Sequence, residues 1–287
     1  MELHFLENDI VEQIKLFISN KLDEDKIKTK YPNPLVRSDI FYILDDYCTV
    51  VYFPLENETI NGFHITGIVD ASEKEHTFVY INTAQTLEKQ VFTAAHELGH
   101  IWGIDEIISS KFSYDFSSEE MENIVSRFAA ELLMPEPIFR ALCISEFDRH
   151  KESRGIITTF NLLKAVAVLM TNFFVPYKAV LHRIAELKII TEDDANMLLG
   201  NAGIPYDEII QLVNKYLKDI GYTDFLEPTN KRRINGLTDL LEKAQQRGTV
   251  STNKINHLRS LFELADDSQI SDNLDAKVNI SLIGDEE

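Results

Sequence analysis

The segment TAAHELGH, residues 93–100, constrains the fold of this chain more than any other, because it carries two histidines on one face of a predicted helix. His96 and His100 are four residues apart, so a helix stacks their imidazole rings roughly 6 Å from each other. That spacing lets both rings reach one Zn²⁺ at about 2.0–2.1 Å. Glu97 lies about 100° further round the helix, where it can take a proton from a water beside the metal. The pattern therefore indicates a zinc site with its own general base.

The competing interpretation is an ordinary helix whose two histidines are satisfied by water or by neighbouring side chains. The pattern His-Glu-x-x-His arises by chance in roughly one chain in a hundred of this length. Three features of its surroundings favour the metal site. The motif lies in a segment with clear helical periodicity, its neighbours Thr93, Ala94 and Gly99 are small, and a predicted strand comes directly before the helix.

A catalytic zinc site needs a third protein ligand and one open coordination position. The residues that follow the second histidine, IWGIDE, contain no further histidine, so we expect a carboxylate from another element. The acidic residues that could supply it are Asp105, Glu106, Glu119, Glu120, Glu122 and Glu131. Glu122 is favoured because it shares a helix face with Val125 and Ala129. A carboxylate at the head of an apolar face points toward the core and needs a partner there.

Most of the other acidic residues have a reason against them. Asp105 and Glu106 are too close to the second histidine in sequence to return easily over the metal. Glu120 is expected to close a capping box with Ser117 at the start of its helix. Glu131 lies on an apolar face of the same helix and is the second choice.

The pattern along the chain predicts an α+β fold. Strands are expected at 48–55, 64–70 and 76–82. Helices are expected at 84–102, capped by Thr83, and at 118–134, which Pro135 ends. The segment 103–118 between them has no strong pattern and is expected to be a loop. Further helices are expected at 158–174, 175–187, 191–199, 206–217, 235–246 and 251–265. The last twenty or so residues are polar and acidic and are expected to be disordered.

Composition and charge limit the classes of function. The chain has 28 basic and 47 acidic residues, a net charge of −19, which disfavours tight binding of nucleic acid by the chain as a whole. Cys48 and Cys143 are far apart, which excludes a disulfide scaffold or a multi-cysteine zinc finger. The N-terminal segment lacks the features of a signal peptide, and no apolar run is long enough to span a bilayer. We therefore expect a protein of the reducing cytosol, with no membrane partner.

The two motifs together resemble the ImmA/IrrE family of metallopeptidases. FTAAHELGHIWG followed by MENIVSRFAAELLMP is similar to the pair of helices that this family joins. One departure is Val125, where the family usually has alanine. The resemblance covers about residues 35–140 and implies a zincin-like core, meaning a small sheet packed with the two motif helices. It also implies one Zn²⁺ held by His96, His100 and Glu122.

The resemblance implies a zinc metallo-endopeptidase in which Glu97 is the catalytic base. Members of this family act inside cells on transcriptional regulators, often repressors of mobile elements. The expected substrate is therefore a helix-turn-helix repressor or an antitoxin-like regulator. The alternative is a regulatory module that uses the same fold to hold a partner without cutting it. The intact Glu97 disfavours that alternative, because a scaffold needs no base.

The same resemblance suggests a division of the chain into three regions. Residues 1–150 are expected to form the metallopeptidase domain with its N-terminal helices. Residues 151–200 are expected to be a helical extension packed on that core, and residues 201–287 a helical region whose role the sequence does not assign. The helix at 175–187 could also be read as a DNA-recognition helix, but the acidic net charge favours a core helix.

Two parts of the predicted site are left open by the sequence. A hydrogen-bond donor for the oxyanion is expected, and several residues are conceivable without a reason to choose among them. They are His150, His182, Tyr114 and Tyr177. The strand at 76–82 is a candidate sheet edge for pairing with an extended substrate.

Overall fold

A computed structural model gives the fold of the chain for residues 5–24, 27–57, 59–68, 75–112, 114–152, 155–201 and 203–264. It divides into two compact units, Met1–Lys231 and Arg232–Glu287. The expected boundaries near 150 and 200 both fall inside the first unit. The acidic tail that we expected to be disordered lies outside the described residues. The histidine motif and Glu122 belong to the first unit, which is described first.

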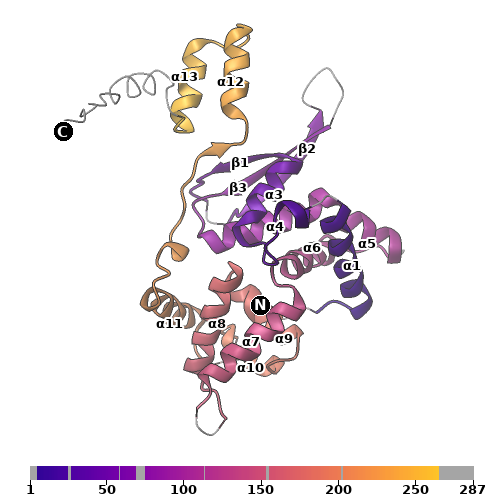
Figure 1. Ribbon diagram of the computed structural model, residues 1–287, viewed down its shortest axis with the longest axis vertical. Coiled ribbons are helices and arrows are strands. Elements are labelled where there is room, and N and C mark those ends of the chain that lie inside the picture. Colours follow the sequence, from indigo (N-terminus) through magenta and orange to yellow (C-terminus); the bar gives the residue numbers. More distant parts are fainter. Residues whose placement is uncertain are drawn as a thin grey trace, which may run out of the picture. The chain divides into compact units, whose positions relative to one another are not determined.

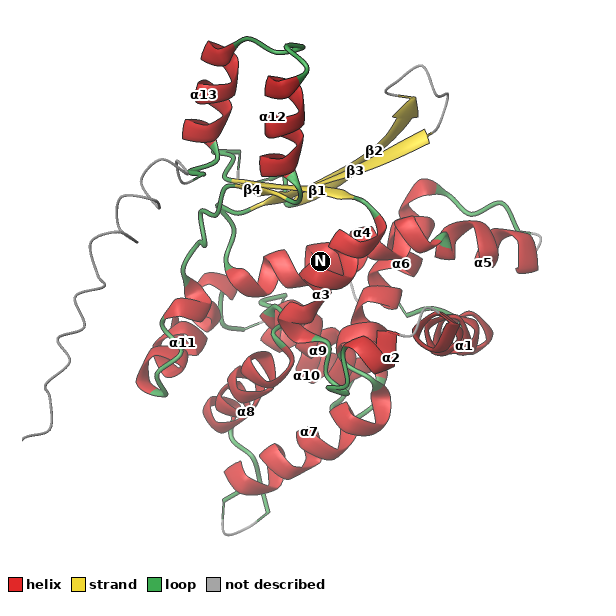
Figure 2. Ribbon diagram, turned by 45° about the horizontal axis from the view of Figure 1, so that its top comes forward, coloured by secondary structure: helices red, strands yellow, loops and turns green. Residues whose placement is uncertain are grey.

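The sheet of the first unit contains β1 (Thr49–Phe53), β2 (Gly62–Ile68) and β3 (Glu75–Asn82). β3 lies in the middle, since it pairs in parallel with β1 and antiparallel with β2. Figure 2 shows these strands together, with α3 and α4 on one side of them. The expectation that residues 76–82 form the sheet edge is wrong. Within the described residues the outer strand beside the histidine helix is β2.

Two helices carry the histidines and Glu122, namely α4 (Leu87–Trp102) and α6 (Ser118–Leu133). They pack side by side (Figure 1). The apolar face of α4 is buried as its periodicity predicts. The predicted capping box of α6 is confirmed, because the Ser117 side chain accepts from the Glu120 backbone and the Glu120 side chain accepts from Ser117 in return.

Several helices support this pair. α1 (Asn8–Glu24) lies against α6, and α3 (Ile40–Tyr47) lies against α4 and β1. The short elements between them are α2 (Ile27–Lys30) and the 3₁₀ turn η1 (Arg37–Asp39). One hydrophobic core runs from α1 through the sheet and α4 to α11, so the motif helices sit in its interior.

Two local expectations around α4 are wrong. The helix begins after Thr86, not Thr83, and the Thr83 hydroxyl instead donates to the Lys231 carbonyl at 2.8 Å. The expected loop after α4 contains a helix, α5 (Ile104–Phe112). α4 ends at Gly103, whose φ of 75° is the left-handed conformation that favours glycine, and α5 starts at the next residue. Ile104 and Ile108, one turn apart, are fully buried and anchor α5 to the core.

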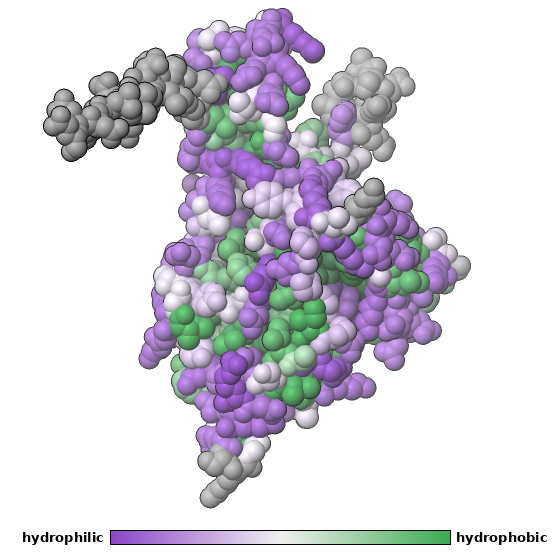
Figure 3. Space-filling view, viewed as in Figure 1, coloured by the Kyte–Doolittle hydropathy of each residue, from purple (hydrophilic) through white to green (hydrophobic). Residues whose placement is uncertain are grey.

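The rest of the first unit is helical. Its helices are α7 (Glu136–His150), α8 (Thr159–Phe173), α9 (Tyr177–Glu186), α10 (Glu192–Leu198) and α11 (Tyr206–Asp219), followed by the 3₁₀ turn η2 (Asp224–Leu226). The predicted fold class, an α+β zincin-like core followed by an all-helical region, is confirmed. On the face shown in Figure 3, hydrophobic side chains gather over the helical part of this unit.

The second unit contains the short strand β4 (Arg233–Ile234) and the helices α12 (Leu237–Gln246) and α13 (Thr252–Leu261). Across the described part of the chain, no single helix has the length and apolar character to cross a membrane. α8 and α9 meet that criterion only when taken together, and they are bent by 105° relative to each other.

Candidate active site

His96, His100 and Glu122 come together where α4 packs on α6. His96 Nε2 lies 3.0 Å from Glu122 Oε2, and His100 Nε2 lies 3.7 Å from Glu122 Oε1. The three donor atoms lie within 4.8 Å of one another. Ligands bound tetrahedrally at about 2.0–2.1 Å are separated by about 3.4 Å, so these distances fit one zinc ion. Two imidazole nitrogens and one carboxylate are also a donor set that zinc accepts in catalytic sites.

The outward-facing nitrogens of both histidines have partners of their own. His100 Nδ1 lies 3.3 Å from Asp105 Oδ2, and His96 Nδ1 lies 3.3 Å from Ser126 Oγ. Such contacts hold a ligating histidine in one ring orientation and direct its other nitrogen to the metal. Burial lowers the pKa of His96, although Glu97 and Glu122 oppose that effect, and the neutral ring is the form that binds metal. Asp105 was expected, if anything, as a third ligand, and Ser126 carries no signal in the sequence that marks it.

The Glu122 side chain does not point into the core. We expected its side chain to point toward the core, but 60% of it is exposed. Its carboxylate lies at the mouth of a cleft of about 630 Å³, which is lined by the loop before β2, the start of β2, α4 and α6. The predicted residue therefore reaches the histidines, but from the solvent side. An open cleft is what a site needs to admit a substrate.

Glu97 occupies the cleft beside the two histidines and is only 5% exposed. Its Oε2 lies 2.9 Å from Nδ1 of His64, a residue of β2 that was not among the predicted site residues. The His64 ring also lies 4.8 Å from the His100 ring, centroid to centroid. No local sequence signal marks His64, because its contact depends on how β2 packs against α4.

Gly99, between the two histidines, sets the distance between α4 and α6. A Cβ atom at this position would lie 2.8 Å from Phe128 Cδ1 and 3.0 Å from Val125 Cγ1, and both of these side chains are fully buried. Val125, which departs from the family pattern, is thus one of the two side chains that leave room only for glycine at position 99. The close approach places Glu122 within reach of both histidines.

Gly99→Ala is expected to destabilise the protein by about 1 kcal/mol. Overpacking costs about 1–3 kcal/mol, and the better helix propensity of alanine offsets about 1 kcal/mol of that. Urea unfolding of the metal-free protein measures the difference. Gly67→Ala is the matched control, since a Cβ there meets no atom within 4 Å. An unfolding midpoint for Gly99→Ala equal to that of wild type would contradict this account of the helix spacing.

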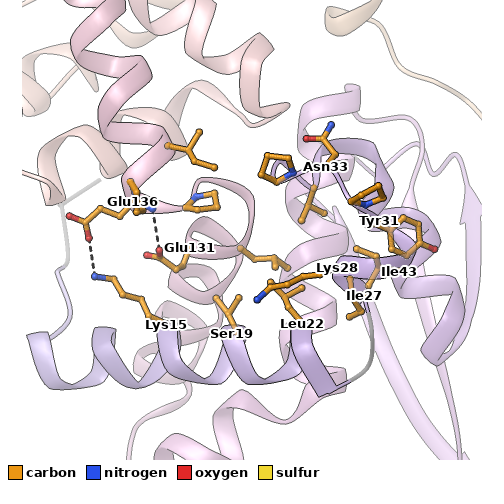
Figure 4. Close-up of a pocket in the computed structure, with 18 of the residues that line it drawn as sticks. Lys15, Ser19, Leu22, Ile27, Lys28, Tyr31, Asn33, Ile43, Glu131 and Glu136 are labelled. Carbon is orange, nitrogen blue, oxygen red and sulfur yellow. Dashed lines mark hydrogen bonds and ion pairs between the residues drawn. The ribbon is translucent and has the colours of Figure 1, made fainter.

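Glu131, the second choice for the third ligand, has other partners. Arg183 and Arg127 donate to its Oε2 at 2.7 and 2.9 Å, and the Glu136 backbone donates to its Oε1. Figure 4 shows its carboxylate beside Glu136 and Lys15, in a separate pocket of about 800 Å³ between α1 and the α6–α7 junction. Glu131 is therefore part of a buried ion-pair network and does not face the histidines.

The four residues considered as oxyanion donors lie elsewhere. Among the described residues that line the cleft, none of the four is present. Tyr177 is buried and donates to the Leu198 carbonyl, and the His150 ring contacts the Glu146 carbonyl. Tyr114 packs against Phe116, and His182 lines a neighbouring pocket beside α9. The polar side chain that does line the cleft beside Glu97 is that of His64, which was not among these four candidates.

Residues around the site are similar to those of known peptidases. A model of a peptidase family, M78, described as the IrrE N-terminal-like domain, matches residues 47–185. The radiation response metalloprotease IrrE of Deinococcus radiodurans is 36% identical over 74 residues, which are 24% of this chain and 22% of that protein. The matched part thus spans about a fifth of that relative's length.

Proposed function

Since residues 47–185 belong to the ImmA/IrrE family of metallopeptidases, we propose that the chain is a zinc-dependent endopeptidase acting on an intracellular protein. The observation that carries the proposal is the grouping of His96, His100 and Glu122 beside the buried Glu97 in an open cleft. The chain has two imidazoles and a carboxylate for one ion, together with a separate carboxylate for proton transfer.

The proposed reaction is hydrolysis of a peptide bond. His96, His100 and Glu122 would hold a zinc ion, which would supply a Lewis acid for the scissile carbonyl and for the attacking water. Glu97 accepts the proton of the attacking water and returns it to the leaving nitrogen. Because Glu97 is buried, its carboxylate is shielded from bulk water during both transfers.

The start of the outer strand β2, residues 62–64, is the proposed support for the substrate backbone. Gly62, Phe63 and His64 line the cleft, so a peptide that adds to this edge runs past the histidines. This replaces the sequence expectation that β3 provides the edge. Phe63 is 42% exposed and stacks on Tyr80 with ring centroids 5.1 Å apart, which offers an apolar contact for a substrate side chain.

The proposed substrate is a helix-turn-helix repressor or an antitoxin-like regulator. The support is the family resemblance together with the net charge of −19, because an acidic protein meets a basic DNA-binding protein faster. The test is to incubate the zinc-loaded full chain with the regulator encoded by the adjacent gene. We expect discrete fragments that form with zinc and cease to form when a chelator removes it. Intact regulator in both conditions would reject this substrate.

A further inference from the structure

One hydrogen bond in the cleft has no assigned role. His64 Nδ1 lies 2.9 Å from Oε2 of Glu97. Within the described part of the chain, this histidine is the only hydrogen-bond partner of the Glu97 carboxylate. The Glu97 side chain is 7% exposed and the His64 side chain 37% exposed, so the contact connects a buried carboxylate to the wall of the open cleft.

The packing of β2 on α4 brings these two residues together. A Cβ atom on Gly62 would lie 2.5 Å from Thr93 Cγ2, so glycine lets the strand approach the helix closely at this point. His64 is two residues further along the strand, about 6.8 Å, and Glu97 is four residues further along the helix, about 6 Å. The distance along the strand and the distance along the helix are nearly equal. His64 also lies on the same face of the strand as Gly62. The close contact at Gly62 therefore sets His64 opposite Glu97.

We propose that His64 is a positioning residue for the general base, holding Oε2 of Glu97 through its Nδ1–H so that Oε1 faces the cleft. Oε1 is then the atom that takes the proton of the attacking water and returns it to the leaving nitrogen. A glutamate side chain has three rotatable bonds, so its carboxylate can adopt many orientations. Fixing Oε2 removes most of the orientations in which Oε1 does not face the attacking water. This inference rests on the proposed peptidase function.

Two substitutions separate a hydrogen-bonding role from a purely structural one. His64→Leu removes the donor, whereas His64→Asn keeps an N–H near the position of Nδ1. Thr66→Val is the matched control, since Thr66 lies on the same face of β2 but does not line the cleft. Because the His64 ring also contacts that of His100, zinc content is measured for every variant by metal analysis.

We expect His64→Leu to lower kcat about 10- to 100-fold with unchanged KM and unchanged zinc content, the usual cost of losing a contact behind a functional group. His64→Asn should recover most of that loss, and Thr66→Val should behave as wild type. A wild-type kcat in His64→Leu, or an equal loss in both His64 variants, would overturn the proposal.

A binding measurement tests the same inference without a substrate. Acetohydroxamate binds a zinc ion through two oxygens and shares its proton with a neighbouring carboxylate, so its affinity reports the placement of Glu97. By calorimetry on the zinc-loaded protein, we expect His64→Leu to bind it about 10-fold more weakly and His64→Asn to bind it nearly as wild type does. Equal affinities in all three proteins would overturn the role of His64. If wild type cleaves no regulator, the proposed function fails separately, and these affinities still decide the role of His64.

Discussion

Glu97→Gln is expected to abolish cleavage of the regulator while leaving zinc bound. Glutamine has the shape of glutamate and its oxygen can still accept from His64, so the cleft should keep its geometry. An amide cannot take the proton of the attacking water. Loss of a general base lowers a rate by about 10²- to 10⁴-fold, or roughly 3–5 kcal/mol of transition-state stabilisation.

The measurement is the rate of fragment formation under single-turnover conditions, together with zinc content and affinity for the intact regulator. Glu106→Gln, a neutralised exposed acid in α5, controls for the change in net charge. If wild type and Glu97→Gln bind the regulator equally and neither cuts it, the chain acts on that partner as a non-cleaving binding module. Equal cleavage by both proteins would remove Glu97 from the reaction.

The parts of the fold that could be predicted are those marked by local sequence patterns. Helical periodicity marks α4 and α6, and the capping box of Ser117 and Glu120 fixes where α6 begins. Similarly, the helix expected at 191–199 is α10, and the Thr191 side chain at its start accepts from the Asp194 backbone. Each of these signals involves residues within one or two turns of each other, so no knowledge of the tertiary structure is required.

The parts that the sequence missed depend on contacts between distant segments. Strand order decides whether β2 or β3 forms an edge, and nothing in either strand alone records it. His64 meets Glu97 across 33 positions only because Gly62 lets β2 approach α4. The segment 103–118 has no strong helical pattern in its sequence, yet two buried isoleucines are enough to hold α5 against the core.

The choice between Glu122 and Glu131 rested on one premise that the structure contradicts. Both acids were judged by the apolar face they share with neighbours on α6. The structure buries Glu131, which pairs with arginines, and exposes Glu122, which faces the histidines. The buried face of α6 thus leads to Glu131 and its ion-pair network. The family motif leads to Glu122, which lies beside the two imidazoles.

Glu122→Gln is expected to remove most of the stabilisation that zinc gives to the folded protein. A ligand that binds only the folded state stabilises it by about 4 kcal/mol when its concentration is 1,000 times Kd. Replacing a carboxylate ligand with a neutral amide weakens binding, because the amide oxygen carries no charge to match the ion. We expect the rise in unfolding temperature on adding zinc to be large in wild type and small in Glu122→Gln.

The exposed position of Glu122 separates the loss of metal binding from a loss of packing. Its side chain is 60% exposed and contributes little to packing, so the metal-free variant should unfold within about 0.5 kcal/mol of wild type. Any difference between the two proteins then arises from the metal. Glu119→Gln, also exposed and three residues earlier on α6, is the matched control and should keep the full response to zinc. An undiminished response in Glu122→Gln would move the third ligand to another group, and Asp105, which already contacts His100, would be the next carboxylate to replace.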